Sequence, residues 1–440
     1  MNIEMGRSQE LYKKAKKLIP GGTQLLSKRP EMFLPENWPA YYASASGVKV
    51  TDLDGRTYID MSIMGVGACV LGYADPDVDR AVKRAIESGA MCTLNAPEEV
   101  ELAETLCGLH PWAAMARFAR SGGEAMSMAV RIARARTGRD MVAFCGYHGW
   151  TDWYLAANLG DSSGLDGHLM PGLSPAGVPR GLKGTSVPFL YNRADQLKEI
   201  AEKNCGSLAA VVMEPQRDHA PCPGFLKEVR EIARKAGAVL IFDEITTGFR
   251  MAPGGIHLIH GIEPDMAVFA KAMANGYAMA AVIGNADVMQ AAQSTFISST
   301  NWTERIGPVA ALATIKKFIR DGAAVRINSA GSMVQNGWKR AAKMAGLEIT
   351  VGELPSLAHF IFERDDAIAL TTLFTQLMLE RGFLAFNQFK PSLAHEDKHV
   401  AAYLAAAQEC FMIIGEAARA GEVESLLKGP VARRGFYRLT

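Results

Sequence analysis

Short apolar runs alternate with amphipathic stretches through the middle of this 440-residue chain. Most of these runs carry no charge and are bounded by glycine, proline or a charged residue, which is typical of buried parallel strands. The amphipathic stretches 123–137 and 224–236 have the spacing of helices that cover such strands. This alternation predicts an α/β fold with a mostly parallel sheet and right-handed crossovers. The predicted strands are 117–120, 141–145, 208–213, 238–242, 266–270 and 280–284.

The pattern differs near the two ends of the chain. Asp54 and Gly55 predict a hairpin within the alternating stretch 48–61. Further helices are predicted at 8–18, 76–88, 97–109, 323–346, 366–381 and 396–421, with a strand at 356–363. We expect three parts, namely an N-terminal segment that joins the small domain (1–75), a large domain (76–320) and a smaller α+β C-terminal domain (321–440). The stretch 159–186 is rich in glycine and proline and longer than most connections, which favours a functional loop or lid.

Composition excludes several classes of protein. The chain is 49% hydrophobic and 21% charged, as in ordinary globular proteins, and its net charge of +1 indicates no nucleic-acid partner. Seven scattered cysteines have neither CxxC nor zinc-like spacing, so we expect reduced thiols, no metal and a cytoplasmic location. The first residues contain no apolar signal-peptide core, and no apolar run approaches the length of a membrane span, so we expect no membrane partner.

The most informative pair of residues is Asp243 and Lys271, because each lies at the end of a short apolar run. The carboxyl ends of parallel strands meet at one edge of a sheet, so the two side chains are expected over one pocket. Pyridoxal phosphate (PLP) needs such a pair. A lysine holds its aldehyde as a Schiff base, and a carboxylate keeps its ring nitrogen protonated. The alternatives are a structural ion pair between Asp243 and Arg250 and a lysine at a helix start whose amine reaches solvent.

Other polar residues follow predicted strands. Ser121, Gly122 and Gly123 precede a helix and are suited to bind a phosphate, although a tight turn would use the same residues. The aromatic ring of Tyr147, which His148 follows, can stack on a flat cofactor. A half-buried turn with aromatic residues would show the same sequence.

Glu214 ends another apolar run. A carboxylate at this position would lie beside the cofactor or the substrate, or it would cap the next element.

The order of these motifs resembles that of the class III, fold type I, PLP-dependent aminotransferases, and within them the glutamate-1-semialdehyde 2,1-aminomutases. The resemblance covers nearly the whole length: IPGG, DLDGRTYIDM, LGYADPDV, RSGGEAMSMAVRIARARTGR, YHGW, EP, IFDEITTGFRMAPGG, PDMAVFAKAMANG and a late AH. It implies a large domain with a mostly parallel seven-stranded sheet and a smaller α+β domain built from the C-terminus and the N-terminal segment.

The resemblance also implies a role for each candidate residue. Lys271 would be the Schiff-base lysine and Asp243 the partner of the pyridinium nitrogen. Thr300 matches a threonine that reaches the phosphate of the neighbouring subunit, which implies a homodimer with sites at its interface. The remaining cofactor-binding residues would be Ser121, Gly122, Gly123, Tyr147, His148 and Glu214.

The chain departs from the aminomutase pattern at three places. The spacing after Pro20 that gives the mutase its substrate arginine leads here to Lys28, with Arg29 one position later. The mutase has a glutamate eight residues before the histidine that corresponds to His395, and here that position is Asn387. A bulky Tyr277 stands within the run that is rich in glycine in the family. Arg29 and Asn387 are the candidate substrate residues.

These features favour a PLP-dependent aminotransferase that moves an amino group from an amino-acid donor, such as glutamate, to a keto or aldehyde acceptor, such as a keto sugar. A true aminomutase, in which one molecule is donor and acceptor, is the first alternative. A catalytically silent binding protein of the same fold is a second, and the retention of both Lys271 and Asp243 speaks against it. A dinucleotide-binding dehydrogenase is disfavoured, because no G-x-G-x-x-G follows a predicted strand.

Overall fold

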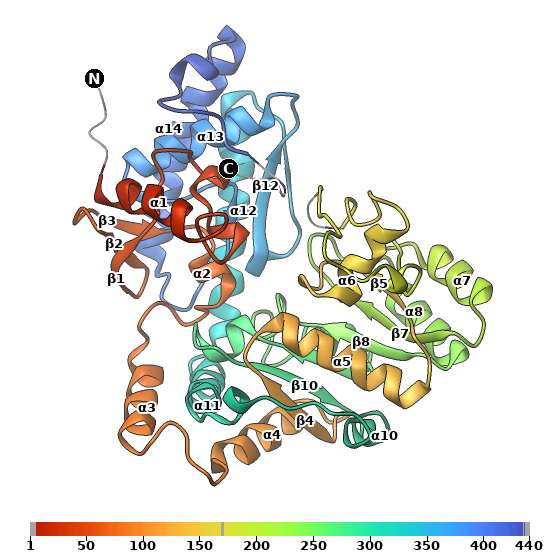
Figure 1. Ribbon diagram of the computed structural model, residues 1–440. Coiled ribbons are helices and arrows are strands. Elements are labelled where there is room, and N and C mark those ends of the chain that lie inside the picture. Colours follow the sequence, from red (N-terminus) through yellow and green to blue (C-terminus); the bar gives the residue numbers. More distant parts are fainter. Residues whose placement is uncertain (1–5, 169–170, 434, 436–440) are drawn as a thin grey trace. The chain divides into compact units, whose positions relative to one another are not determined.

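The computed structural model describes residues 6–168, 171–433 and 435 (Figure 1). The chain forms two compact units. One consists of the chain up to Asp75 and from Val325 onward, and the other of Pro76–Ala324.

The Pro76–Ala324 unit is built on a seven-stranded sheet, as predicted. Its order is β4-β10-β9-β8-β7-β5-β6, and β10 alone runs antiparallel to its neighbours. The strands are β4 (Met115–Ala119), β5 (Met141–Cys145), β6 (Ser186–Pro188), β7 (Leu208–Met213), β8 (Val239–Asp243), β9 (Met266–Phe269) and β10 (Ala280–Gly284). The sequence did not predict β6, because a strand of three residues is too short to show a hydrophobic period.

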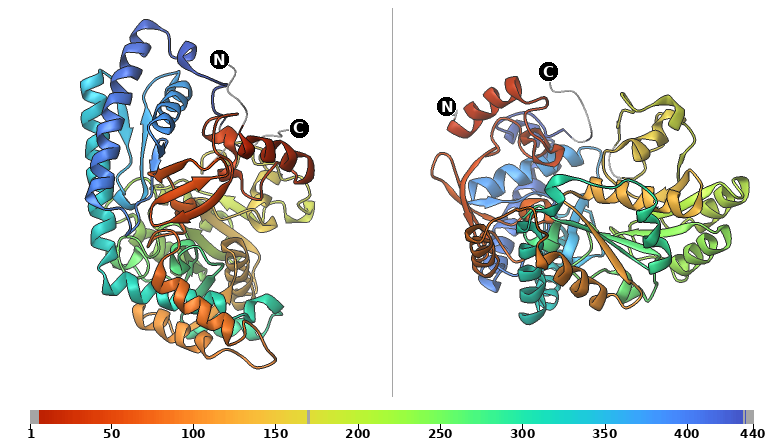
Figure 2. Two further views of the ribbon diagram at one scale, coloured as in Figure 1. Left: turned by 90° about the vertical axis from the view of Figure 1, so that its left-hand side faces the viewer. Right: turned by 60° about the horizontal axis from the view of Figure 1, so that its bottom comes forward.

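Helices cover both faces of this sheet, which explains why its strands are continuously apolar. Helix α5 (Gly122–Thr137) packs on the face that carries Val212 and Ile241, and Figure 1 shows it running along the sheet. Helices α7 (Ala194–Lys203) and α8 (Phe225–Ala236) lie on the opposite face, against Val211 and Leu240. The two views of Figure 2 show the helices layered on the strands.

Three longer helices pack together beside the sheet: α3 (Pro76–Glu87), α4 (Pro97–Leu109) and α11 (Ile306–Arg320). The sequence predicted α3 and α4 but not α11. The buried face of α11 includes Gly307, Ala310, Ala311 and Thr314, and such small or polar residues give a weak hydrophobic period. The remaining short helices of this unit are α6 (Asp152–Leu155), α9 (His257–His260) and α10 (Ala286–Met289).

The described residues of the stretch 159–186 are packed against their own unit. Leu165 is fully buried, and the Asn158 amide donates to the carbonyl of Leu173 over 2.6 Å. His168 accepts a hydrogen bond from the backbone of Gly146, next to Tyr147. These contacts anchor the segment, so any movement as a lid must break them.

The unit formed by the two ends of the chain contains two small sheets. The first has the order β1-β2-β3-β13 and includes the predicted hairpin, in which Thr51 pairs with Thr57 and Gly55 has φ +81°. Its strands are β1 (Tyr42–Ser46), β2 (Lys49–Asp52), β3 (Thr57–Asp60) and β13 (Phe383–Leu384). The second sheet comprises β11 (Ile349–Val351), β12 (Ala358–Phe362) and β14 (Gln388–Phe389).

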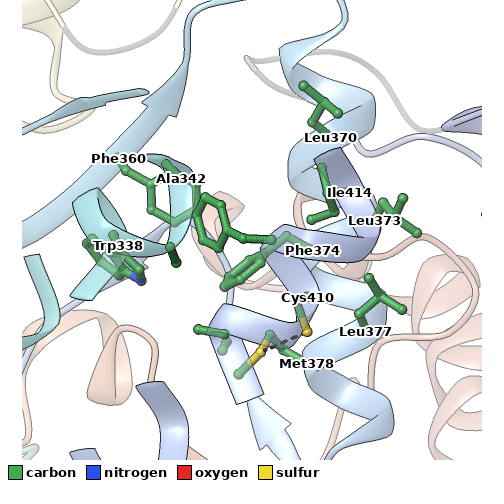
Figure 3. Close-up of a cluster of buried hydrophobic side chains, with 14 of the residues drawn as sticks. Trp338, Ala342, Phe360, Leu370, Leu373, Phe374, Leu377, Met378, Cys410 and Ile414 are labelled. Atoms are coloured by element: carbon green, nitrogen blue, oxygen red, sulfur yellow. Dashed lines mark hydrogen bonds between the residues drawn. The ribbon is translucent and has the colours of Figure 1, made fainter. Parts of the chain in front are cut away.

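The helices of this unit enclose an aromatic core. Figure 3 shows Trp338, Phe360 and Phe374 gathered between β12 and the long C-terminal helices, with Met378 in contact with Cys410. The helices are α1 (Arg7–Leu18), α2 (Met64–Gly67), α12 (Ala323–Ala345), α13 (Ala367–Glu380) and α14 (Asp397–Ala420). All except the short α2 were predicted within two residues.

Among the described residues, α14 is the one helix whose length and apolar composition would suffice to cross a membrane. Half of its most apolar window is buried inside the protein, and Tyr403, Phe411 and Ile414 contribute to the aromatic core. We therefore interpret α14 as a core helix.

Candidate active site

Three neighbouring parallel strands end at one edge of the seven-stranded sheet, and each delivers a charged residue there. Glu214 follows β7, Asp243 is the last residue of β8, and Lys271 comes two residues after the end of β9. Because these strands are hydrogen-bonded in the order β7-β8-β9, the three side chains lie at the same carboxyl edge. The arrangement is the one expected for Asp243 and Lys271.

Asp243 is buried and pairs with His148. Its Oδ2 lies 2.8 Å from Nδ1 of His148, and its Oδ1 accepts a hydrogen bond from the backbone N–H of Ile245. The other ring nitrogen of His148, Nε2, is 3.1 Å from the carbonyl oxygen of Cys145. Since a carbonyl only accepts, Nε2 is the donor in that contact, and Nδ1 faces the carboxyl group at hydrogen-bond distance. His148 is thus a partner of Asp243. Arg250, the partner considered from sequence, donates from Nε to the carbonyl of Thr246.

Lys271 occupies a strained position. Its φ of +47° lies in the left-handed region, which residues with a Cβ adopt at a cost. Its Nζ donates a hydrogen bond to Oγ1 of Thr246 over 2.9 Å. Burial of the amine lowers its pKa to about 8, and the nearby Arg217 guanidinium acts in the same direction. At neutral to mildly alkaline pH a substantial fraction of this amine is therefore uncharged and nucleophilic.

Glu214 organises the loop that follows β5. Burial raises the pKa of this carboxyl, but the Arg217 guanidinium, His148 and the backbone N–H of Tyr147 together hold the pKa below its usual value. Both oxygens of Glu214 lie 3.0 Å from Nη1 of Arg217, and Oε2 also accepts from the backbone N–H of Tyr147. The glutamate thus fixes the backbone that carries Tyr147.

Tyr147 and the preceding glycine form a close turn against Glu214. Gly146 has φ +110°, and a Cβ there would come within 2.7 Å of the Glu214 carboxylate, so this position requires glycine. The half-buried ring of Tyr147 packs edge-on against Tyr154, whose hydroxyl donates to the Gly146 carbonyl. This packing holds the aromatic ring in one orientation at the sheet edge.

The N-terminus of α5 provides a cradle of backbone N–H groups. Ser121 caps the helix in a reciprocal capping box with Glu124, so its hydroxyl is already engaged. The backbone N–H groups of Gly122 and Gly123 have no hydrogen-bond partner among the described residues. A Cβ at Gly122 would lie 2.9 Å from Ile245 and one at Gly123 3.3 Å from the indole of Trp150, so both positions suit glycine. These two N–H groups, at the positive end of the helix dipole, can receive a phosphate.

Thr300 lies on an exposed segment that arginines attach to its own chain. Arg117 donates to the carbonyl of Ile297, and Arg120 donates to that of Trp302. Thr300 itself is exposed and begins a 3₁₀ helix, Thr300–Thr303. Its role toward a neighbouring subunit stays a prediction.

Arg29 and Asn387, the candidate substrate residues, belong to the unit built from the chain ends. Arg29 is buried, and a Cβ at Gly21 would overlap its guanidinium. Asn387 is also buried, and its amide donates to the carbonyl of Phe360 over 2.8 Å, which connects β14 to β12. Contact of either residue with a substrate stays a prediction.

Two residues that the sequence did not single out take part in the cluster. Thr246 accepts the hydrogen bond from Lys271, and Arg217 binds Glu214. Arg217 could have been predicted from the sequence, because it stands three residues after Glu214 and two side chains at this spacing beyond a strand can meet. Thr246 gave no comparable signal, because it contacts Lys271 only once β8 and β9 are paired.

Comparison with known proteins agrees with this geometry. A family model described as Aminotransferase class-III matches residues 35–396. A 3-aminobutyryl-CoA aminotransferase of Cloacimonas acidaminovorans is 32% identical, over 87% of this chain and 91% of its own length. A glutamate-1-semialdehyde 2,1-aminomutase of Syntrophobacter fumaroxidans is 31% identical, over 93% of this chain and 98% of its own. A solved structure titled "Transaminase with PLP bound" is 26% identical with a TM-score of 0.83, covering 95% of this chain and all of that one.

Proposed function

This chain belongs to the class III aminotransferases, and we propose that it moves an amino group from an external amino-acid donor to a separate keto or aldehyde acceptor. The enzyme depends on PLP, as members of this family do. The choice of a separate acceptor, such as a keto sugar, is supported by the departures at Lys28 and Asn387 from the aminomutase pattern.

The residues at the sheet edge fit the cofactor. When bound, PLP supplies an electrophilic aldehyde and a ring that accepts electrons from a carbanion. Lys271 offers an amine that is about half uncharged near pH 8, and the buried Asp243 lies where a ring nitrogen can be bound. Gly122 and Gly123 at the start of α5 leave two backbone N–H groups that can receive a phosphate.

The chain's own groups can also move a proton. Lys271, once free of the cofactor, has a pKa close to the working pH, which is the condition for a general acid and base. The hydroxyl of Thr246 holds its Nζ at 2.9 Å and limits where that proton is delivered. The contact between His148 and Asp243 keeps the carboxyl group oriented toward the same edge. The single observation that carries the proposal is that Lys271 and the buried Asp243–His148 pair lie at the same carboxyl edge of the sheet.

We also propose that the working form is a homodimer in the cytoplasm, with Thr300 of each chain reaching the phosphate site of the other. The support for a dimer is the exposed segment that carries Thr300, which Arg117 and Arg120 bind through its backbone carbonyls. The nearby side chain of Phe296 is 84% exposed, which is unusual for an aromatic residue unless a partner covers it. The support for the location is that all seven cysteines are free thiols.

An aminomutase is the second candidate, favoured by the 31% identity to a protein of that name over nearly the whole chain. The two candidates differ in whether an external donor is required. The test supplies glutamate-1-semialdehyde without any donor and, separately, amino-acid donors with keto acceptors. We expect transfer only in the second case, together with a visible absorbance that borohydride fixes to Lys271. Efficient donor-free formation of 5-aminolevulinate would instead identify a mutase, and failure of trapping at Lys271 would refute both candidates.

A further inference from the structure

Arg217 is a charged residue at the site edge to which the proposed function gives no role. It lies three positions after Glu214, and its Nη1 is 3.0 Å from each oxygen of that buried carboxylate. The side chain of Glu214 is 6% exposed, whereas that of Arg217 is 26% exposed. The ion pair therefore holds the guanidinium in place while part of it stays open to solvent.

The guanidinium is held at the same edge as Lys271. Glu214, Asp243 and Lys271 follow three adjacent parallel strands, with Met213 opposite Phe242 and Asp243 opposite Val268. Burial lowers the pKa of Lys271 and raises that of Tyr147; the charge of Arg217 adds to the first shift and opposes the second, which places it near both groups.

Arg217 retains donors for a further ligand. Both hydrogen bonds to Glu214 use Nη1, and a guanidinium has five N–H donors in a planar fork. Among the described residues, Nε and Nη2 of Arg217 have no hydrogen-bond partner. A planar fork of this kind can donate two parallel hydrogen bonds to the two oxygens of a carboxylate.

We propose that Arg217 binds the carboxylate of the amino-donor substrate, so that the donor class is an amino acid rather than a simple amine. The inference rests on the proposed function, because the donor's amino group must reach Lys271. A carboxylate a few bonds from that amino group then falls within reach of a guanidinium at the same sheet edge. Glu214 acts as the positioning residue that holds the guanidinium before the donor arrives.

The kinetic test compares donors that differ in one group. Alanine and isopropylamine share a skeleton, with a methyl group in place of the carboxylate, and β-alanine with n-propylamine places the carboxylate one carbon farther away. Arg217→Gln should raise KM for the carboxylate donor about 10- to 100-fold, the usual cost of a lost charge-assisted contact. The ratio of kcat/KM for the carboxylate donor to kcat/KM for the matched amine should fall by the same factor, because any change at Lys271 or Glu214 affects both donors alike.

Two further variants separate binding from folding. Arg217→Lys keeps a positive charge beside Glu214 but loses the planar fork, so it should fold normally and still raise KM for the carboxylate donor. Arg230→Gln is the matched control, because Arg230 also pairs with a carboxylate, Asp265, at the opposite edge of the sheet. The control should leave both donors unaffected. Equal losses for amine and carboxylate donors in the Arg217 variants would overturn the proposal.

Two measurements do not depend on turnover. Glutarate, a dicarboxylate without an amino group, should bind the PLP-loaded wild-type protein in calorimetry and bind Arg217→Gln at least about tenfold more weakly. The pKa of Lys271 in cofactor-free protein, measured by pH-dependent labelling, should rise above about 8 in Arg217→Gln because a neighbouring positive charge is removed. Equal glutarate affinities, or an unchanged lysine pKa, would exclude Arg217 as the anchor. If borohydride still fixes the cofactor to Lys271 in that case, the proposed function holds and only the role of Arg217 is refuted.

Discussion

At the scale of single residues, Lys271 combines a left-handed backbone with a buried amine. An ammonium cannot attack an aldehyde, so the uncharged fraction decides how fast the cofactor is captured. Burial disfavours the charged form and brings the pKa from an ordinary 10.5 to about 8. The rate at which cofactor-free protein takes up PLP should therefore rise with pH and reach half of its maximum near pH 8. Stopped-flow absorbance between about pH 6.5 and 9.5 checks this value, and a rate still rising at the upper limit would contradict it.

Asp243 is the second residue whose chemistry can be tested alone. Asp243→Asn keeps the shape of the side chain but removes the charge that would pair with a protonated ring nitrogen. Turnover should fall roughly 100- to 1000-fold, the range typical for the loss of one preorganised electrostatic partner. The matched control is Asp265→Asn, since Asp265 precedes β9 at the opposite edge of the sheet. Single-turnover rates with unchanged far-ultraviolet circular dichroism are the measurement, and near-normal rates would show that another group binds the ring nitrogen.

At the scale of elements, the loop after β8 is held by a buried carboxylate. Glu244 is fully buried and accepts hydrogen bonds from the backbone and Nδ1 of His257 and, over 2.5 Å, from the hydroxyl of Thr247. Trp112 donates to Nε2 of His257, which fixes the ring with its proton on Nδ1. The same loop carries Thr246, so this network supports the partner of Lys271.

The stability of this loop gives the prediction at the element scale. Thr247→Val preserves shape but leaves one oxygen of the buried carboxylate without its hydroxyl donor. The free energy of unfolding should fall by about 1.5–3 kcal/mol, as expected for a hydrogen bond to a charged group. Thr105→Val is the control, because its hydroxyl bonds the carbonyl of Glu101 on an exposed helix, and it should cost about 0.5 kcal/mol or less. Urea denaturation of the cofactor-free proteins measures both, and equal midpoints would contradict the role given to Glu244.

At the scale of the whole molecule, the dimer decides whether each site is complete. If Thr300 serves the other chain, a dimer of one Lys271→Ala chain and one Thr300→Ala chain contains one intact site and one that lacks both residues. Random re-pairing makes half of the dimers hybrid, so a mixture of two inactive variants should recover about a quarter of wild-type activity. Activity after reversible subunit exchange is the measurement. Recovery no greater than the sum of the parents would mean that Thr300 serves its own chain.

The alternation of apolar runs and amphipathic stretches was sufficient to predict the α/β unit and most of its elements. Buried residues recur at regular spacings along a strand or a helix, and apolar residues in the sequence show the same spacings. The same logic placed Asp243 and Lys271 at strand ends, where parallel strands bring their residues to one edge. It failed for α11 and β6, where small residues or short length erased the period.

What the sequence by itself determined is therefore the identity of the elements and the presence of a lysine and a carboxylate at their ends. The tertiary structure decided which groups meet: His148 reaches Asp243 across 95 positions, Thr246 reaches Lys271, and Arg217 turns back onto Glu214. Such contacts depend on strand order and register, which fix distances between residues far apart in the chain. The positive φ of Lys271 is likewise imposed by the tertiary structure, because a lysine by itself prefers a negative φ.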